Sequence, residues 1–277
     1  MECKLRKMID TLITKIVEQE APSNDVAVLM SGGVDSLTCA FAAQRLGKKV
    51  HTYTMFVNGQ ENSDSKASRH AAEIFGWDHH EINVPVDNIR DDFLRLMSYY
   101  DCKKKTHVEC TFPFLYVYPH IKEKHVLSGV AADGWYGVSK RANIHFKHTK
   151  ELFDKFRTDY FGASNPAGIR QQEQLCEEIE ANLVAPYVRE SVKEWMMQYD
   201  HDFFNKPYQK APIIEAFPEF NHLTKNRKHA NLQLVAGIPE YFETLLEDKQ
   251  LNFKNRGRTM DLVRDYIGYH QNNSLFA

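Results

Sequence analysis

The sequence predicts an α/β protein, with a doubly wound parallel sheet followed by a mainly helical half. One observation is that short apolar or alternating segments rich in β-formers take turns with helical segments up to about residue 142. Another is that the later periodic segments all have helical spacing, with polar residues, proline or glycine between them. Strands that alternate with helices form parallel sheets, and right-handed crossovers place helices on both faces.

The alternating half is expected to contain one leading helix and four strands. Apolar residues at helical spacing predict an amphipathic helix over residues 3–19, which Pro22 ends. Buried or alternating runs predict strands at about 26–30, 50–57, 79–84 and 125–128. Glycines and capping residues predict helices between them at about 36–46, 64–75, 87–99 and 112–124. The stretch 101–111, with lysines at 103–105, is expected to be a solvated loop.

The second half is expected to be helical throughout. Its periodic segments lie at about 149–161, 170–182, 187–199, 212–220, 229–236, 239–247 and 259–267. We therefore divide the chain into an N-terminal helix (1–20), an α/β core (21–145) and a mainly helical region (146–277). No internal repeat is visible in the sequence.

Composition limits the class of protein. The formal net charge is −2, so a nucleic-acid partner is not favoured and would need a local basic patch. No apolar run approaches the ~20 residues that span a bilayer, and the first residues lack the apolar core of a signal peptide. The 5 cysteines are scattered without a Cys-x-x-Cys pair, which argues against a disulfide framework or a zinc ribbon. We expect a cytoplasmic protein without a membrane partner, and leave open whether it forms a homo-oligomer.

The stretch Leu29–Ser36 (Leu-Met-Ser-Gly-Gly-Val-Asp-Ser) combines the end of a strand, a turn of small residues and a helix N-terminus. Glycines let backbone N–H groups approach an oxyanion, and the helix dipole favours negative charge there. Ser31 and Ser36 add hydroxyl donors, and Asp35 can hold a cation beside phosphates. The lysine and spacing of a Walker A loop are absent. The stretch therefore predicts binding of nucleotide phosphates.

A second turn of small residues, Leu127–Gly137, follows the fourth expected strand and contains Asp133. On its own, Asp133 would more often be a turn residue. If both strands are parallel and central, however, Asp35 and Asp133 emerge on the same rim of the sheet. Two such carboxylates suit Mg²⁺, which prefers few protein oxygens together with phosphate and water.

These stretches resemble motifs of the asparagine synthase-like branch of the PP-loop ATP pyrophosphatases. Residues 31–36 match the Ser-Gly-Gly-x-Asp-Ser signature, and residues 127–137 resemble the Leu-Ser-Gly-Glu-Gly-Ala-Asp-Glu-x-x-Gly-Gly motif. Residues 184–188 are similar to the family's Val-Pro-Phe-Leu-Asp element, and Lys210–Phe217 to the helix that begins with its catalytic lysine. The resemblance covers roughly residues 20–245, without the glutamine-hydrolysing domain of asparagine synthetases.

The resemblance implies an adenine nucleotide α-hydrolase-like fold and an AMP-forming ligase that uses ATP and Mg²⁺. A small carboxylate would attack the α-phosphorus, pyrophosphate would leave, and ammonia or an amine would take the acyl group to give an amide. Lys210 would be catalytic, and Asp35 and Asp133 would hold the metal. By the same resemblance, ATP or pyrophosphate would contact Leu29, Ser31, Gly32, Gly33, Asp35, Ser36, Met55, Ser128, Gly129, Arg227 and Lys228.

Two positions depart from the family pattern. Val130 stands where the family has a glutamate, or a tyrosine in β-lactam synthetases, that is associated with the amine's proton; Gly134 stands where it has a second glutamate. Valine cannot transfer a proton, so the second substrate stays open, and an amine that is already neutral needs no strong base. Ordinary asparagine synthesis is accordingly less favoured.

Two other classes remain as alternatives. The first is a PP-loop enzyme that modifies a nucleobase, tRNA or DNA, although paired cysteines and a four-cysteine zinc site are absent. The second is a non-catalytic nucleotide-binding module, which Val130 and Gly134 favour. Retention of Asp35, Asp133 and Lys210 argues against such a module, because pure binding does not require all three.

Overall fold

A five-stranded parallel sheet forms the centre of the protein, in a computed structural model that describes residues 2–163, 165–224 and 230–273. The strand order is β3-β2-β1-β4-β5, and each neighbouring pair is parallel. The strands are β1 (Asp25–Leu29), β2 (Lys49–Val57), β3 (Asp78–Val84), β4 (His125–Leu127) and β5 (Asn182–Val184). The predicted α/β class with a parallel sheet is confirmed.

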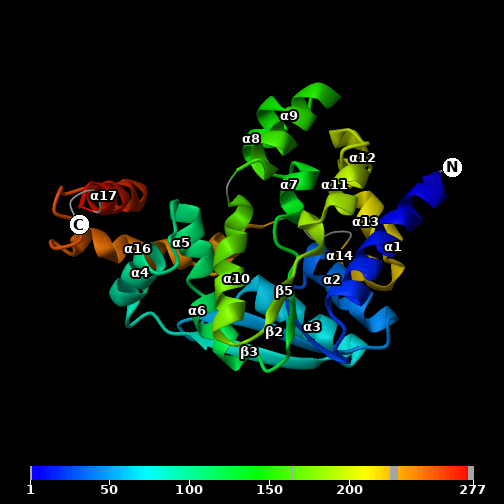
Figure 1. Cartoon of the computed structure of the whole chain (residues 1–277), viewed down its shortest axis with the longest axis horizontal. Helices are drawn as coiled ribbons and strands as arrows, with labels where there is room; N and C mark the ends of the chain where they lie inside the picture. The colour runs from blue at the N-terminus through cyan, green and yellow to red at the C-terminus, as the bar shows by residue number, and fades with distance from the viewer. Residues whose placement is uncertain (1, 164, 225–229, 274–277) are drawn as a thin grey trace.

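Helices precede, connect and follow these strands (Figure 1). In the first half they are α1 (Glu2–Glu20), α2 (Val34–Arg45), α3 (Ser63–Phe75), α4 (Ile89–Ser98), α5 (Lys105–Thr111) and α6 (Phe114–Val117). Next come α7 (Ala132–Tyr136), α8 (Lys140–His145), α9 (Lys150–Phe161), α10 (Ile169–Glu178), α11 (Glu190–Met196) and α12 (His201–Asn205). The last are α13 (Ala211–Ala216), α14 (Asn221–Thr224), α15 (Leu232–Val235), α16 (Ile238–Glu243) and α17 (Thr259–Asn273).

Local sequence explains where α3 begins and ends. The Asn62 side chain accepts hydrogen bonds from the N–H groups of Asp64 and Ser65, and Ser65 Oγ accepts one from the Asn62 N–H, which completes a capping box. Gly76 ends the helix in a left-handed conformation, at φ 68°. This helix therefore follows the boundaries that the sequence predicts.

Three expectations about individual elements were wrong. The chain does not stop alternating after residue 142, because β5 pairs with β4 at the edge of the sheet. The three residues of β5 begin at the end of the segment with helical spacing at about 170–182, so that pattern masks the strand. Lys105 begins α5, so the lysine-rich stretch is only partly a loop; the helix expected at 112–124 is reduced to α6 and a 3₁₀ turn at Tyr118–His120. The division at residue 145 stays a prediction.

The sheet separates two apolar layers, and successive residues of β1 belong to one layer and then the other. Val26 and Val28 pack with α1, α2 and α13, whereas Ala27 and Leu29 pack with α4, α5 and α16. Successive side chains of a strand point to opposite faces, so a strand covered on both sides is apolar throughout. Figure 1 shows these two groups of helices on opposite sides of the view. This packing holds the ends of the central strands in place.

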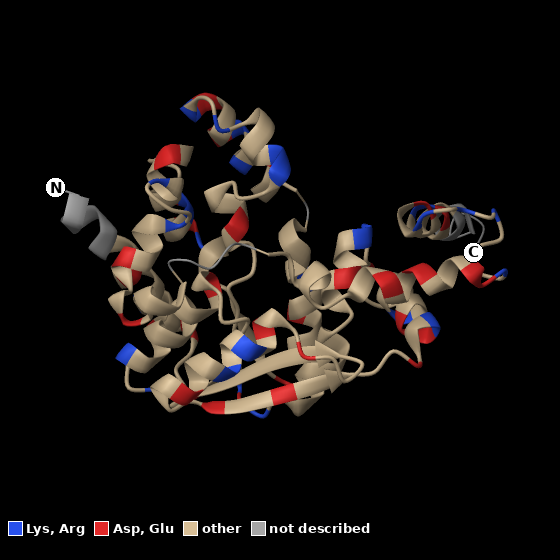
Figure 2. Ribbon diagram, turned by 180° about the vertical axis from the view of Figure 1, so that it is seen from behind, with Lys and Arg blue, Asp and Glu red and all other residues tan. Residues whose placement is uncertain are grey.

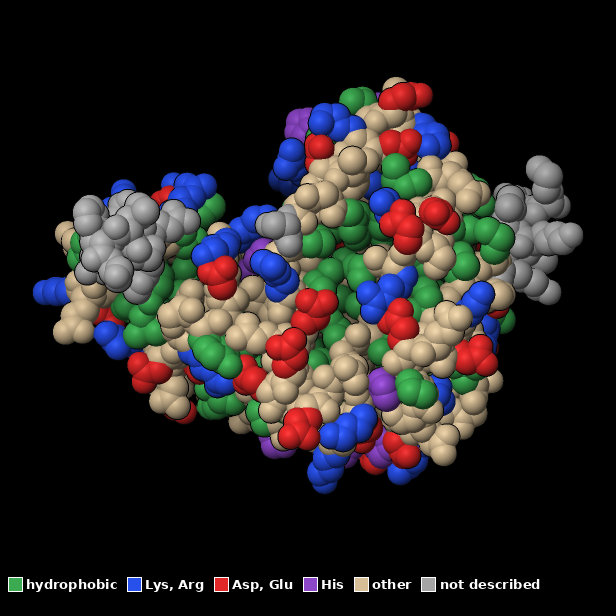
Figure 3. Space-filling model, viewed as in Figure 1, with side chains coloured by type: hydrophobic (Ala, Val, Ile, Leu, Met, Phe, Trp, Pro, Cys, Tyr) green, Lys and Arg blue, Asp and Glu red, His purple; other side chains and the backbone are tan. Residues whose placement is uncertain are grey.

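Charged residues of both signs are interspersed over the molecule. Figure 2 shows Lys and Arg as well as Asp and Glu in many parts of the ribbon, and the face in Figure 3 carries both signs. This mixture of signs agrees with the net charge of −2. Within the described part of the chain, none of the helices combines the length and apolar character required to cross a bilayer.

Candidate active site

The loops after β1 and β4 face each other at the carboxyl ends of these two strands. β1 pairs with β2 on one side and with β4 on the other, so the chain changes direction across the sheet at this point. Ligands of open α/β sheets bind at such switch points. A cavity of about 480 Å³ lies there, within the roughly 300–1,000 Å³ of small-molecule sites.

Hydrogen bonds within the loop after β1 give it a defined shape. The Gly33 N–H donates to Ser31 Oγ (3.3 Å), and Ser36 Oγ donates to the Gly33 carbonyl oxygen (3.1 Å). Gly33 occupies the N-cap of α2 and has no side chain to cover the N–H groups of the first turn. Ser31, Gly33 and Ser36 line the cavity, so this loop presents donors to an anion.

Gly32 has a different position from its neighbours in this loop. Its φ is +67°, and a Cβ there would lie 2.7 Å from the backbone carbonyl carbon of Ala67 in α3. Gly32 is not among the residues that line the cavity. Its small size therefore lets α3 pack against the loop.

The loop after β4 touches the first loop at Gly129. A Cβ on Gly129 would lie 2.7 Å from the backbone carbonyl carbon of Asp35. The next turn is tight, with Ala131 at φ 68° and the Val130 N–H donating to Ser128 Oγ (3.3 Å). Glycine at 129 therefore sets how closely the two loops approach.

We expect Gly129→Ala to push the loops apart, lowering the free energy of unfolding by about 1–3 kcal/mol and weakening ATP binding. Denaturant unfolding and calorimetric titration with ATP measure the two effects. The matched control is Gly257→Ala, since a Cβ at Gly257 would meet nothing within 4 Å. Equal stability of the two variants would contradict the close approach.

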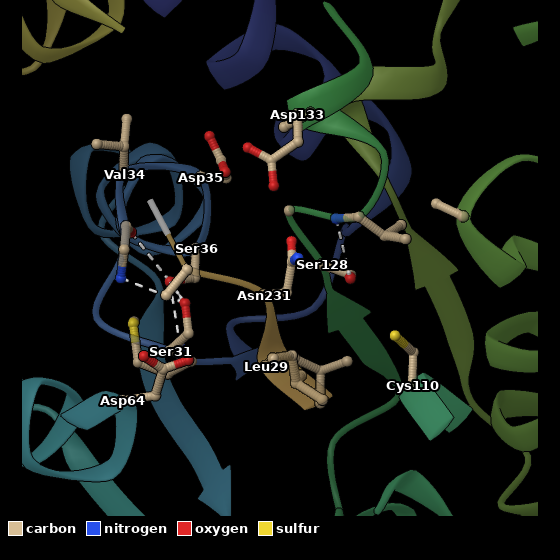
Figure 4. A pocket seen from close by; sticks show the side chains of 18 of the residues that line it. Leu29, Ser31, Val34, Asp35, Ser36, Asp64, Cys110, Ser128, Asp133 and Asn231 are labelled. Atoms are coloured by element: carbon tan, nitrogen blue, oxygen red, sulfur yellow. Dashed lines mark hydrogen bonds between the residues drawn. The ribbon is translucent and has the colours of Figure 1, made fainter. Parts of the chain in front are cut away.

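Lys210 lies between the two predicted carboxylates. It is 6% exposed, and its Nζ is 2.6 Å from Asp35 Oδ2 and 2.7 Å from Asp133 Oδ1. Figure 4 shows the carboxylates of Asp35 and Asp133 pointing toward each other at one end of the cavity. The predicted juxtaposition of the two aspartates at one rim is thus present, and a lysine distant in sequence joins them.

The backbone conformation at the start of α13 places Lys210 between the two aspartates. Lys210 is the N-cap of α13 at φ 60°, and Pro212 lies in the first turn. A left-handed conformation is unfavourable for a residue with a Cβ and is often found at functional sites. Proline suits the first turn, because the N–H that it lacks has no partner within the helix there.

Electrostatics keep Lys210 charged. Burial acts to lower the pKa of its ammonium, but the carboxylates of Asp133 and Asp35 outweigh burial and raise the pKa above the ordinary value. The group is therefore a cation at neutral pH, and it can neutralise charge but cannot act as a base.

The donor set at this rim also fits a divalent cation. Asp35 and Asp133 supply carboxylate oxygens that already converge on one positive atom, and both residues line the cavity. Their side chains are 18% and 41% exposed, so water can reach them. Carboxylate oxygens completed by water and phosphate are the ligands that Mg²⁺ prefers, so these two residues could hold it.

The rest of the cavity wall contains predicted and unpredicted residues. Leu29, Met55, Ser128 and Gly129 line it, as the resemblance implies, whereas Arg227 and Lys228 lie outside the described residues. Lining residues that sequence reasoning missed include Tyr53, Thr54, Ser63, Asp64 and Asn231. The run of capping residues directly after the second expected strand was a usable signal for Ser63 and Asp64, because it places them at the same rim.

Tyr160 packs closely against Gly134. A Cβ on Gly134 would overlap the Tyr160 ring, which also lines the cavity. The aromatic side chain of α9 thus fills the space beside Gly134, and a larger residue at position 134 would overlap it. Burial raises the pKa of the Tyr160 hydroxyl, and Asp133 and Cys110 raise it further, so the group stays neutral. Sequence reasoning missed Tyr160, because an aromatic residue of a helix is usually part of the core.

Val130, Cys110 and Gln172 line the same cavity as Tyr160. Cys110 Sγ lies 3.4 Å from Gln233 Oε1, which links α5 to the segment after residue 230. The Oε1 atom of Gln172 is buried and has no hydrogen-bond partner among the described residues. Gln172 Oε1 can therefore accept a hydrogen bond from a ligand. The Val130 side chain has no polar atom, so it can take no part in proton transfer.

Comparison with known proteins gives a match over most of the chain. The family model described as asparagine synthase matches residues 8–251. Asparagine synthetase [glutamine-hydrolyzing] 3 of Arabidopsis thaliana is 27% identical over 146 residues, covering 48% of this chain and 24% of that protein. The matched region thus spans about a quarter of that relative's length.

Solved structures with similarity to this chain have a lower sequence identity. An NMN synthetase from Francisella tularensis is 12% identical with a TM-score of 0.37, covering 84% of this chain and 99% of the other. A U34-tRNA thiolase from Methanococcus maripaludis is 13% identical with a TM-score of 0.37, covering 96% and 78% respectively.

Proposed function

Because the chain belongs to the asparagine synthase family, we propose that it is an ATP-dependent ligase that activates a small carboxylate and releases pyrophosphate. The observation that carries the proposal is Lys210, held between Asp35 and Asp133 beside the loop after β1. These three side chains would have two roles in the first step. The aspartates would hold the metal beside the phosphates, and Lys210 would neutralise charge at the α-phosphate that is attacked. A site that only binds nucleotide has no need of a buried lysine shared by two carboxylates.

In the first step, the carboxylate attacks the α-phosphorus of ATP, and the bond to the pyrophosphate oxygen breaks. The loop Ser31–Ser36 donates N–H and hydroxyl groups to the departing pyrophosphate, and Lys210 neutralises charge at the α-phosphate. Asp35 and Asp133 would hold Mg²⁺, which would supply positive charge to offset that of the phosphates. The products are an acyl-adenylate and pyrophosphate.

In the second step, ammonia or an amine attacks the acyl carbon, giving an amide, AMP and a proton. Val130, Tyr160 and Lys210 cannot accept that proton at neutral pH, for the reasons given above. The nucleophile is therefore an amine that enters the site neutral, and the proton that it loses on forming the amide passes to a substrate phosphate or to water. Gln172 Oε1 can orient the N–H of such an amine.

A pyrophosphate-release screen over amino acids, other small acids, nucleotides and amines tests this proposal. We expect AMP and pyrophosphate in equal amounts with one class of acid, and an amide in the mass spectrum once the amine is added. Reactions without acid are the control. Formation of ADP, or no pyrophosphate from any acid, would refute the assigned reaction.

A nucleic-acid substrate is the rival class, and it has a separate signature. Binding to tRNA or DNA would weaken steeply as salt rises, because counterions are released when phosphates are neutralised. Pyrophosphate release that depends on added tRNA or DNA, and on no small acid, would move the protein to that class.

A further inference from the structure

A second cluster of side chains that can bind a metal lies near the amino ends of the strands, away from the nucleotide cavity at their carboxyl ends. His51 is near the start of β2, Asp78 and His80 are at the start of β3, and Glu123 precedes β4. His51 and Asp78 are paired in register across the two parallel strands. The cavity described above lies at the other, carboxyl ends of the strands, so this cluster is independent of the proposed function.

The cluster has the spacing of a metal site. His51 Nδ1 is 3.1 Å from Asp78 Oδ2 and 3.4 Å from Glu123 Oε1, and His80 Nε2 is 3.7 Å from Asp78 Oδ2. One ligand atom from each of His51, Asp78 and His80 lies within 4.8 Å of the others. A tetrahedral metal with ligands at about 2.0–2.1 Å separates them from one another by roughly 3.3 Å. The distances from His51 Nδ1 to Asp78 and Glu123 are close to that value, and the distance from His80 to Asp78 is slightly longer.

Charge at the cluster also calls for a cation. Two carboxylates face the same ring nitrogen of His51, although an imidazole nitrogen has at most one proton to donate. The side chains of His51 and Glu123 are only 11% and 7% exposed, and a buried carboxylate is costly without a positive partner. A cation between Nδ1 and the two carboxylates satisfies all three groups at once.

The surrounding contacts orient the ligand atoms as in known metal sites. The second ring nitrogen of His51, Nε2, lies 3.2 Å from Asp25 Oδ1, the carboxylate–histidine arrangement that fixes which nitrogen faces a metal. The Tyr53 hydroxyl donates to Glu123 Oε2 (2.9 Å), so Oε1 is turned toward His51. The His80 ring stacks on the Tyr53 ring at 4.6 Å.

We propose that His51, Asp78, His80 and Glu123 bind one Zn²⁺ ion. Two imidazole nitrogens with two carboxylate oxygens suit Zn²⁺, whereas Mg²⁺ prefers oxygen ligands in octahedral geometry. In this proposal Glu123 is the fourth ligand beside the three convergent side chains, and a site closed by four protein ligands would be structural. The ion would join β2, β3 and the segment before β4 without cysteine, which is why the cysteine pattern of the sequence gives no sign of it.

The test uses the full chain, stripped of metal with a chelator and kept in excess Mg²⁺, then titrated with Zn²⁺ alone in a calorimeter. We expect one tightly bound Zn²⁺ per chain and a rise in the thermal midpoint, since an ion that binds only the folded state stabilises it. Replacement by Co²⁺ should give the visible absorption bands of a tetrahedral site. His80→Gln and Asp78→Asn should each weaken binding by about tenfold or more.

His80 and Asp78 are the informative positions, because their side chains are 39% and 49% exposed and their replacement leaves the core intact. The matched controls are His70→Gln, an exposed histidine of α3, and Asp133→Asn in the nucleotide cavity; both should keep the bound ion. Failure to bind Zn²⁺, or equal binding by wild type, His80→Gln and Asp78→Asn, would overturn the proposal. Loss of the ion in Asp133→Asn alone would assign it to the nucleotide cavity instead.

Discussion

Replacing Lys210 with alanine should lower the rate of ATP–pyrophosphate exchange by about 10²- to 10³-fold, while ATP binding stays measurable. The ammonium is buried, and it is within 2.7 Å of both aspartates. Its charge is thus placed before the reaction begins, where negative charge builds up on the phosphate in the transition state. Exchange of labelled pyrophosphate into ATP measures the first step alone and is independent of the unknown amine.

Lys206→Ala is the matched control for this variant. Lys206 also pairs with an aspartate at 2.6 Å, but its side chain is 71% exposed, and surface pairs contribute little. The control should exchange at the wild-type rate. If Lys210→Ala exchanged within a factor of about two of wild type while remaining folded, Lys210 would have no part in the first step.

The raised pKa of Lys210 also determines how pH acts on the site. A lysine whose folded-state pKa lies above its unfolded value stabilises the fold fully below the unfolded pKa of about 10.4. That contribution is lost as pH rises through the higher folded-state pKa. The exchange rate should accordingly show no titration of Lys210 near neutral pH.

Asp35→Asn and Asp133→Asn should each raise the Mg²⁺ concentration needed for half-maximal exchange by about tenfold or more. An amide keeps the shape of the side chain but removes the charge that attracts both the metal and Lys210. Exchange rates measured across a Mg²⁺ titration at fixed ATP separate this effect from a loss of folded protein. The lysine then has one carboxylate partner in place of two, so a lower thermal midpoint is expected as well.

The control for the aspartates is Asp202→Asn, which breaks the surface pair with Lys206. It removes a carboxylate–ammonium pair of the same length, 2.6 Å, at an exposed position. Its Mg²⁺ curve should match that of wild type. Wild-type curves in both Asp35→Asn and Asp133→Asn would remove the two residues from the metal site that we propose.

The sequence could predict the rim where the site lies, because parallel strands bring their carboxyl ends to one edge. That rule, with two turns of small residues, was enough to place Asp35 opposite Asp133. Lys210 was a different case. Nothing in the spacing of the chain connects a lysine with an aspartate 175 residues away, so only the resemblance to a known family pointed to it.

Other features could not be predicted, because they depend on how distant segments pack. The ring of Tyr160 occupies the space beside Gly134, and a glycine in a sequence does not say which neighbour approaches it. The same holds for Gly32, whose small size serves contact with α3. β5 has three residues and begins where a segment with helical spacing ends, so its pairing with β4 emerges only from the assembled sheet.

The long separation between Lys210 and Asp35 also has a consequence for folding. Contacts between distant parts of a chain form late, since a long loop must close before they stabilise anything. A nascent chain that has reached only β5 contains the whole nucleotide loop and both carboxylates, but no ammonium between them. Competence to react is thus one of the last properties that the growing polypeptide acquires.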